Sequence, residues 1–145
     1  MPTFTLDTVI DAPREMVYDI FADRERNGEF LPVQTRLVTP GTDERQGVGA
    51  VHFLGVGAVG VREQITELVP GHRIRYRIVG GIAPVREHTG TIVFSDADAG
   101  TRVQYTMAST PALPAPGFAV RLALRALVTA FVTGARKEAK RRTTR

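Results

Sequence analysis

The middle of the chain, residues 41–109, consists of short strand-like segments separated by regularly spaced turn signals. Glycine and proline mark these turns at Gly41, Gly47, Gly55–Gly57, Pro70-Gly71, Gly80-Gly81 and Ala99-Gly100. The segments between the turns are about eight to eleven residues long, which is the spacing of an antiparallel meander. This region therefore predicts antiparallel strands that pair with their neighbours along the chain.

Apolar and polar residues alternate within these segments, as expected for strands with one buried face. In residues 72–79 the apolar residues, Tyr76 among them, alternate with three arginines. In residues 102–107 the same pattern places Tyr105 and Met107 on one face. The sheet is thus expected to cover a core on one side and to face solvent on the other.

Helical patterns lie on both sides of the meander. Residues 3–10 alternate and predict a first strand, and Asp11-Ala12-Pro13 then opens a helix that ends near Asp23. A second short helical turn is expected before Gly28, and a strand at about 34–39.

After a proline-rich connector, residues 117–140 predict a long helix with one broad apolar face. We expect that face to consist of Val120, Leu124, Leu127, Val128, Phe131 and Ala135. The opposite face carries Phe118, Leu122 and Val132, which a monomer would leave exposed. These three residues indicate either ordinary scattered exposure or a contact with the connector or a second subunit.

The order of these elements is that of an α+β domain. The apolar face of the long helix has to cover the concave face of a curved sheet. Such a sheet, wrapped around a single helix, tends to leave a cavity, and cavities of this kind are the usual place for small ligands.

The segment Gly55–Gly60 matches the dinucleotide fingerprint G-x-G-x-x-G. The acidic residue expected about twenty positions later is absent, because the next strand ends in Gly80-Gly81. A glycine-rich hairpin turn is the better interpretation, and no cofactor is expected.

Composition excludes several other classes of site. Hydrophobic residues make up 43% of the chain and charged residues 23%, values typical of a globular domain. With no cysteine and three histidines, neither a thiolate nucleophile nor a metal site is expected. No apolar run approaches the roughly 20 residues of a membrane span, so no transmembrane segment is expected. The N-terminus lacks the pattern of a signal peptide, which predicts a cytoplasmic protein.

The net charge of +4 is concentrated at the C-terminal end, where Glu138 is outnumbered by Arg136, Lys137, Lys140, Arg141, Arg142 and Arg145. A nucleic-acid-binding protein should carry a basic stripe on its folded surface, so this distribution does not favour nucleic-acid binding. A helix end with cations near the negative pole of the helix dipole is the commoner arrangement.

Alternation also predicts which titratable groups face the interior. In residues 85–94, Ile92 and Phe94 should point inward, which places His88 and Arg86 on the same face. Glu63 falls on the inward face of residues 59–68. The hydroxyls of Tyr76 and Tyr105 join this group, whereas His52 is interpreted as outward-facing.

Three interpretations of the inward group stay open. Glu63 and Arg86 can form a buried ion pair that fixes strand register, with His88 hydrogen-bonded to either. The group can instead recognise an oxygen of a bound ligand. In the third, Glu63 or His88 takes a proton next to a carbonyl while Arg86 stabilises the enolate. A register slip or bulge would turn the set outward.

Two blocks of the sequence resemble a known superfamily: IDAPREMVYDIFAD at residues 10–23, and VREQITELVPGHRIRYRIVGGIAPVREHTGTIVF followed by GTRVQYTM at residues 61–107. They are similar to the SRPBCC superfamily of START-related, Bet v 1-like helix-grip proteins, in its bacterial polyketide cyclase/dehydrase-like branch. The resemblance implies a curved seven-stranded antiparallel sheet wrapped around the long helix, with two short helices after the first strand. It implies one domain over residues 1–140, and we expect a basic disordered tail at 141–145.

Because the superfamily includes lipid and hormone carriers, cyclases and regulators, the resemblance alone does not imply an enzyme. The expected function is binding, as a carrier or sensor, of a small hydrophobic molecule such as a lipid, an isoprenoid or an aromatic polyketide. The alternative is a cyclase, aromatase or dehydratase that uses acid–base chemistry without metal or cofactor. A third hypothesis is a regulator that contacts protein or RNA through the basic tail and the helix face with Phe118 and Leu122. The sequence leaves open whether the chain is a monomer or a homodimer.

The residues expected to line the cavity come from strands and helix alike. They are Glu63, Tyr76, Arg86, His88, Phe94, Tyr105, Met107, Leu124, Leu127 and Phe131. Glu63, His88 and Arg86 are also the catalytic candidates.

Overall fold

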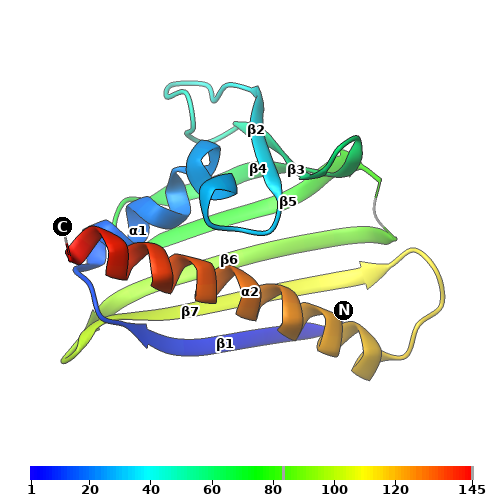
Figure 1. Ribbon diagram of the computed structural model, residues 1–145. Helices are drawn as coiled ribbons and strands as arrows, with labels where there is room; N and C mark the ends of the chain where they lie inside the picture. The colour runs from blue at the N-terminus through cyan, green and yellow to red at the C-terminus, as the bar shows by residue number, and fades with distance from the viewer. Residues whose placement is uncertain (83, 145) are drawn as a thin grey trace.

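The computed structural model describes residues 1–82 and 84–144 and forms one antiparallel sheet with helices on its concave side (Figure 1). The elements in chain order are β1 (Thr3–Ile10), α1 (Arg14–Ala22), the 3-10 helix η1 (Arg24–Glu29), β2 (Gln34–Thr39), β3 (Val51–Val56), β4 (Val59–Val69), β5 (Arg73–Gly81), β6 (Val85–Ala97), β7 (Gly100–Pro111) and α2 (Gly117–Thr143). The seven strands follow the order β1-β7-β6-β5-β4-β3-β2. The α+β helix-grip fold expected from the sequence is confirmed.

The meander from β2 to β7 pairs each strand with the next, as the turn spacing predicts. β1 is the exception, because it pairs with β7 at the other edge of the sheet. α1 and η1 carry the chain from β1 to the opposite edge at β2. The sheet bends around α2, which lies across its concave face (Figure 1).

The glycine-rich segment is the hairpin between β3 and β4. Gly57 has φ +62°, the left-handed backbone that glycine adopts without strain. Gly55 and Gly60 face each other across the hairpin, and a Cβ on Gly55 would lie 2.2 Å from the Val59 carbonyl oxygen. The glycines therefore serve a tight strand pair, as the hairpin interpretation expects.

The end of the molecule under α1 is filled with aromatic side chains. Tyr18 and Phe21 of α1 pack on Phe94 of β6, with ring centroids 5.5 and 5.8 Å apart. Phe21 also packs edge-on against Tyr105, at 6.0 Å. This cluster closes one end of the space between sheet and helices, so any cavity has to lie toward the other end.

α2 departs from its expected limits and faces. It continues to Thr143, so residues 141–143 are helical where a disordered tail was expected, and residue 145 lies outside the described residues. Arg141 and Arg142 pair with the buried Glu138, which holds this last turn. Val132 is buried rather than on the exposed face, while Leu127 is 39% exposed.

α2 is also long and apolar enough to cross a membrane, by length and composition only. No such segment was expected from the sequence, because a few arginines interrupt the helix and leave no unbroken apolar run. In this fold the helix packs against the sheet through Val128, Phe131 and Ala135, the position of a core helix.

Candidate ligand-binding cavity

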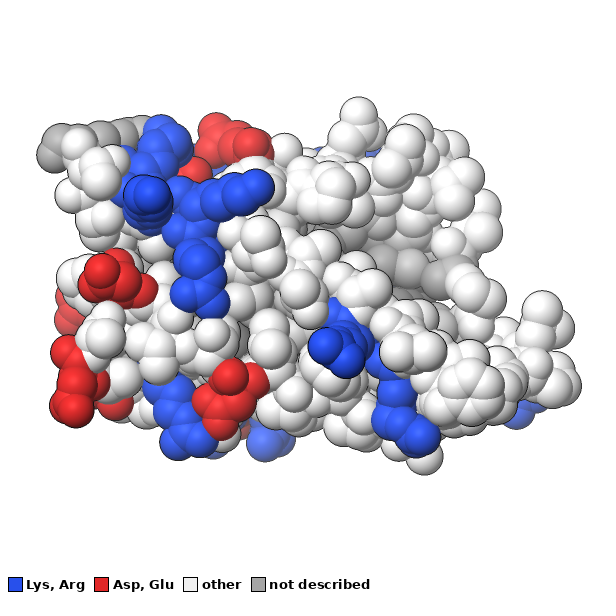
Figure 2. Space-filling view, turned by 60° about the horizontal axis from the view of Figure 1, so that its bottom comes forward, with Lys and Arg blue, Asp and Glu red and all other residues white. Residues whose placement is uncertain are grey.

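A cavity of about 560 Å³ lies between the sheet and the N-terminal half of α2, at the end opposite α1. Strands β3 to β7 form one wall, α2 the other, and the connector 111–117 closes one side. Its lining is apolar except for Glu63, His88 and Ser109. Figure 2 shows the surface hollowed at this end, between side chains that carry no charge.

His88 and Ser109 form a polar pair in the cavity wall. Their Cα atoms are directly opposed across β6 and β7, so both side chains face the same side of the sheet. The imidazole is 6% exposed, and no described residue hydrogen-bonds to it. Burial lowers the pKa of His88, so the ring is neutral at pH 7. A neutral imidazole can both donate and accept one hydrogen bond.

Glu63 does face inward, but its partner is Arg24 of η1 and not Arg86. The two side chains form a buried ion pair at the floor of the cavity. Burial raises the pKa of the Glu63 carboxyl, against the opposing effect of the Arg24 guanidinium. Burial likewise opposes the charge on Arg24, yet Glu63 keeps the pKa of Arg24 raised. Because arginine stays protonated in proteins, we take the pair as ionised.

The inward position expected for Arg86 is wrong. β6 and β7 change register between Val85 and Glu87, which is a β-bulge at Arg86. A bulge adds one residue to a strand and reverses the side on which the next side chain points. Arg86 is consequently exposed and does not line the cavity, while His88 beyond the bulge keeps its inward position.

Tyr76 and Tyr105 lie beside the ion pair in the core. Their hydroxyls are 2.5 Å apart, and the Arg24 guanidinium lies over the Tyr76 ring, 4.8 Å from its centroid. Burial raises the pKa of both phenols, so both stay protonated. The two tyrosines and the pair thus form one polar layer within an apolar core.

His52 is fully buried, which corrects the outward orientation expected for it. Its Cα is opposite that of Glu63 on β4, so both residues point to the concave side. Nε2 of His52 donates to Oε1 of Gln46 at 3.1 Å, and Nδ1 has no partner among the described residues. Burial, reinforced by Arg24, lowers the pKa of His52 to about 4.

The structure brings only part of the expected set to the cavity. Glu63, His88, Leu124, Leu127 and Phe131 line it. Four further expected residues are buried but lie outside its lining: Tyr76, Phe94, Tyr105 and Met107. Sequence reasoning missed Ser109, although its alternation with Met107 and Tyr105 was a usable signal. It also missed Arg24, whose short helix has no periodic pattern.

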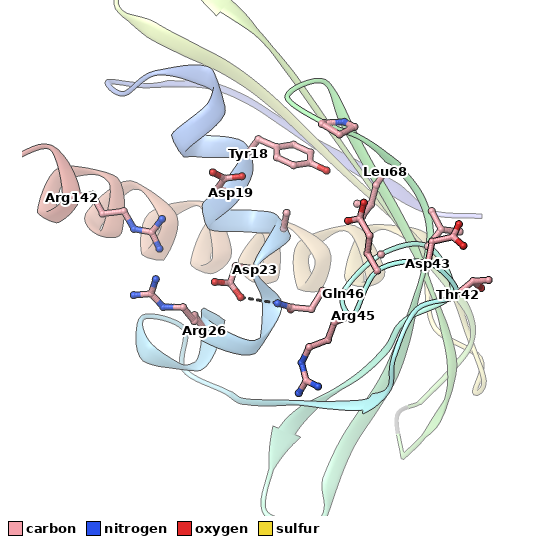
Figure 3. A pocket seen from close by; sticks show the side chains of 15 residues that line it. Tyr18, Asp19, Asp23, Arg26, Thr42, Asp43, Arg45, Gln46, Leu68 and Arg142 are labelled. Atoms are coloured by element: carbon pink, nitrogen blue, oxygen red, sulfur yellow. Dashed lines mark hydrogen bonds between the residues drawn. The ribbon is translucent and has the colours of Figure 1, made fainter.

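A second hollow lies at the opposite end, between α1, the β2–β3 loop and the β4–β5 turn (Figure 3). Its volume is about 1050 Å³, and charged side chains of both signs line it, among them Asp19, Asp43, Arg26 and Arg142. Gln46 donates to Oδ1 of Asp23 at 2.9 Å across its floor. We regard it as a solvated surface recess, because charged side chains line it and it holds none of the inward-facing cluster.

Metal binding has no structural support in the described part of the chain. No group of three or more His, Asp or Glu side chains there is placed to hold an ion.

Comparison with known families gives a match over nearly the whole chain. The family described as polyketide cyclase / dehydrase and lipid transport matches residues 1–143. The chain belongs to this family. No curated protein compared with the chain matched it.

Solved structures share the fold of this chain at low sequence identity. A START superfamily protein from Mycobacterium smegmatis has a TM-score of 0.84 at 13% identity, over 96% of this chain and 97% of that one. The protein TTHA0849 from Thermus thermophilus has a TM-score of 0.73 at 24% identity, over 95% and 97%. The di-domain ARO/CYC BexL of the BE-7585A biosynthetic pathway has a TM-score of 0.75 at 24% identity, over 94% of this chain and 49% of that one.

Proposed function

We propose that the protein binds a small, mainly apolar molecule that carries a hydroxyl or keto oxygen, with its apolar body in the cavity and its oxygen at His88 and Ser109. The observation that carries this proposal is the unpartnered, neutral His88 imidazole in a mainly apolar lining. The volume of about 560 Å³ falls within the rough 300–1000 Å³ range of small-molecule sites.

The polar end of the ligand follows from the chemistry of the pair. A buried imidazole with free hydrogen-bonding capacity favours a ligand that completes its bonds and disfavours a pure hydrocarbon. A strongly anionic ligand finds little support, because the Arg24 charge is already balanced by Glu63 and Arg86 lies outside the cavity lining.

The test uses 2-naphthol and naphthalene as probes that differ by one hydroxyl, with affinities measured by calorimetry. We expect 2-naphthol to bind about threefold to tenfold more tightly, the value of one hydrogen bond. H88L should remove that difference while leaving the binding of naphthalene intact. Equal affinities in the parent protein would contradict the role of His88.

Filling the cavity gives the matched control. Ala123 and Ala126 are both exposed alanines of α2, but of the two only Ala123 lines the cavity. A123F should weaken both probes strongly, whereas A126F should leave them unchanged. Native mass spectrometry of the freshly purified protein would reveal a co-purified ligand directly.

A second candidate function is acid–base catalysis of the cyclase or aromatase type. It is favoured by the same neutral His88, which can accept a proton from carbon next to a carbonyl, and by the likeness to the ARO/CYC protein BexL. Arg86 cannot serve as the enolate-stabilising group, since it lies outside the cavity. Glu63 is already engaged in the ion pair with Arg24. Its role in this second function would therefore be to hold that arginine in place.

The probe for this second function is 2-tetralone in deuterated water. His88 would take a proton from the α-carbon, and the imidazole, after exchange with solvent, would return a deuteron to the same carbon. We expect protein-catalysed exchange, followed by proton NMR, that H88Q abolishes. Exchange at the uncatalysed rate, with binding intact, would leave only the carrier function.

A further inference from the structure

The rim of the cavity is built from three segments that contain no charged side chain. They are residues 54–61, the described residues 78–82 and 84–85, and residues 109–120. Backbone hydrogen bonds join them, from Ile82 N to the Gly60 carbonyl at 2.7 Å and from Ala112 N to the Pro84 carbonyl at 2.9 Å. Three turns that are distant in sequence therefore form one continuous uncharged end of the molecule.

This end also carries the most exposed apolar side chains of the described chain. The six large hydrophobic residues with the highest exposed fractions, 59–71%, are Val56, Val59, Ile82, Leu113, Phe118 and Leu122. All six lie on the three segments or on the adjoining turn of α2. Exposed apolar side chains that gather at one end of a molecule mark an interaction site more often than single scattered ones do.

Four arginines lie around this end of the molecule without an ion-pair partner in the described part of the chain. Arg62, Arg86, Arg121 and Arg125 follow the uncharged segments closely in sequence, and none of them has an acidic partner within 4.0 Å among the described residues. At the other end, Arg14, Arg26, Arg45 and Arg102 each form an ion pair. In Figure 2 the charged side chains in view around the hollow are blue, and the red ones lie farther away.

The distribution of charge indicates what binds to this surface. A second copy of the chain would bring unpaired arginines against unpaired arginines, with Glu87 the nearby exposed acid. An anionic bilayer complements both features, because its phosphates bind arginine and its acyl boundary accepts isolated apolar side chains. The apolar tips stand on separate turns, which suits a fluid apolar phase better than a shaped protein partner.

We propose that the protein docks on anionic phospholipid membranes with the cavity mouth toward the bilayer, through the apolar residues of the rim and the flanking arginines. The inference rests on the proposed function, since it gives an apolar ligand a path into the cavity that avoids water. The outward apolar residues of α2 would then lie at the depth of the lipid headgroups, and the buried face of the helix would stay on the sheet.

The test is flotation of the full chain with vesicles of phosphatidylcholine, with and without about 30% phosphatidylglycerol. We expect binding that requires phosphatidylglycerol and weakens with added salt. R121E/R125E and F118D/L122D should each weaken binding at least about tenfold. These residues do not line the cavity, so 2-naphthol binding should persist.

Two controls change the charge at the far end. K137E/K140E alters charge equally on the last turns of α2, and V48D places a charge at an exposed valine of the β2–β3 loop. Both should bind vesicles as the parent protein does. The proposal would be overturned if the controls lost vesicle binding to the same extent, or if the parent protein did not bind vesicles. It would also be overturned if the protein were a dimer that F118D converts to a monomer. If the protein binds vesicles but not 2-naphthol, membrane docking is supported and the proposed ligand-binding function is contradicted.

Discussion

The Glu63 carboxylate on β4 and the Arg24 guanidinium on η1 form an ion pair in which each side chain is only 6% exposed. The pair ties the 3-10 helix to the floor of the cavity, and Arg24 also covers the Tyr76 ring. Removing water from two charges is costly, so the arrangement is stable only while both partners are present.

Breaking this pair from one side should therefore be strongly destabilising. We expect R24M to lower the free energy of unfolding by about 3–5 kcal/mol, because Glu63 is left as an uncompensated buried charge. The double variant R24M/E63L should recover most of that loss. Urea unfolding of the two single variants and the double variant measures the coupling, and additive effects would mean that the charges do not interact.

His52 makes stability depend on pH. Its pKa of about 4 in the folded protein lies below the ordinary value of 6.5, so the unfolded chain binds the proton more readily. The stabilisation is complete above pH 6.5 and is lost as the pH falls toward 4. We expect H52Q to flatten this part of the stability profile, measured by denaturant unfolding between about pH 7 and about pH 5. If the stability of H52Q depends on pH as steeply as that of the parent protein, other groups cause the pH dependence.

Gly90 provides the space for Tyr76. The two residues are paired across β5 and β6, and a Cβ on Gly90 would lie 2.1 Å from Cζ of the tyrosine ring. G90A should displace Tyr76 from Arg24 and Tyr105 at a cost of about 1–3 kcal/mol. G80A is the matched control, since the nearest atom to its Cβ would be Arg62 Cδ at 3.9 Å. Similar melting temperatures for the two variants would show that the ring can move freely.

Most of the inward set could be predicted from local pattern. Alternation with period two places Glu63, Tyr76, His88 and Tyr105 on the concave side, and the structure has all four buried there. The expectation fails for Arg86, because a bulge changes the period by one residue, and nothing in the local sequence marks that bulge. It fails for His52 because Val51 and Phe53 are apolar on both sides, so no alternation was available to orient it.

The sequence by itself determined the strands, their order in the meander, the long helix and the uncharged stretches at the turns, since these depend on neighbouring residues and their spacing. Only the tertiary structure decided that Arg24 neutralises Glu63, and that three distant uncharged segments form one rim around the cavity. The physical reason is range. Periodicity acts over a few residues, whereas the partner of a buried charge and the neighbours of a loop are set by how the whole sheet curves around α2.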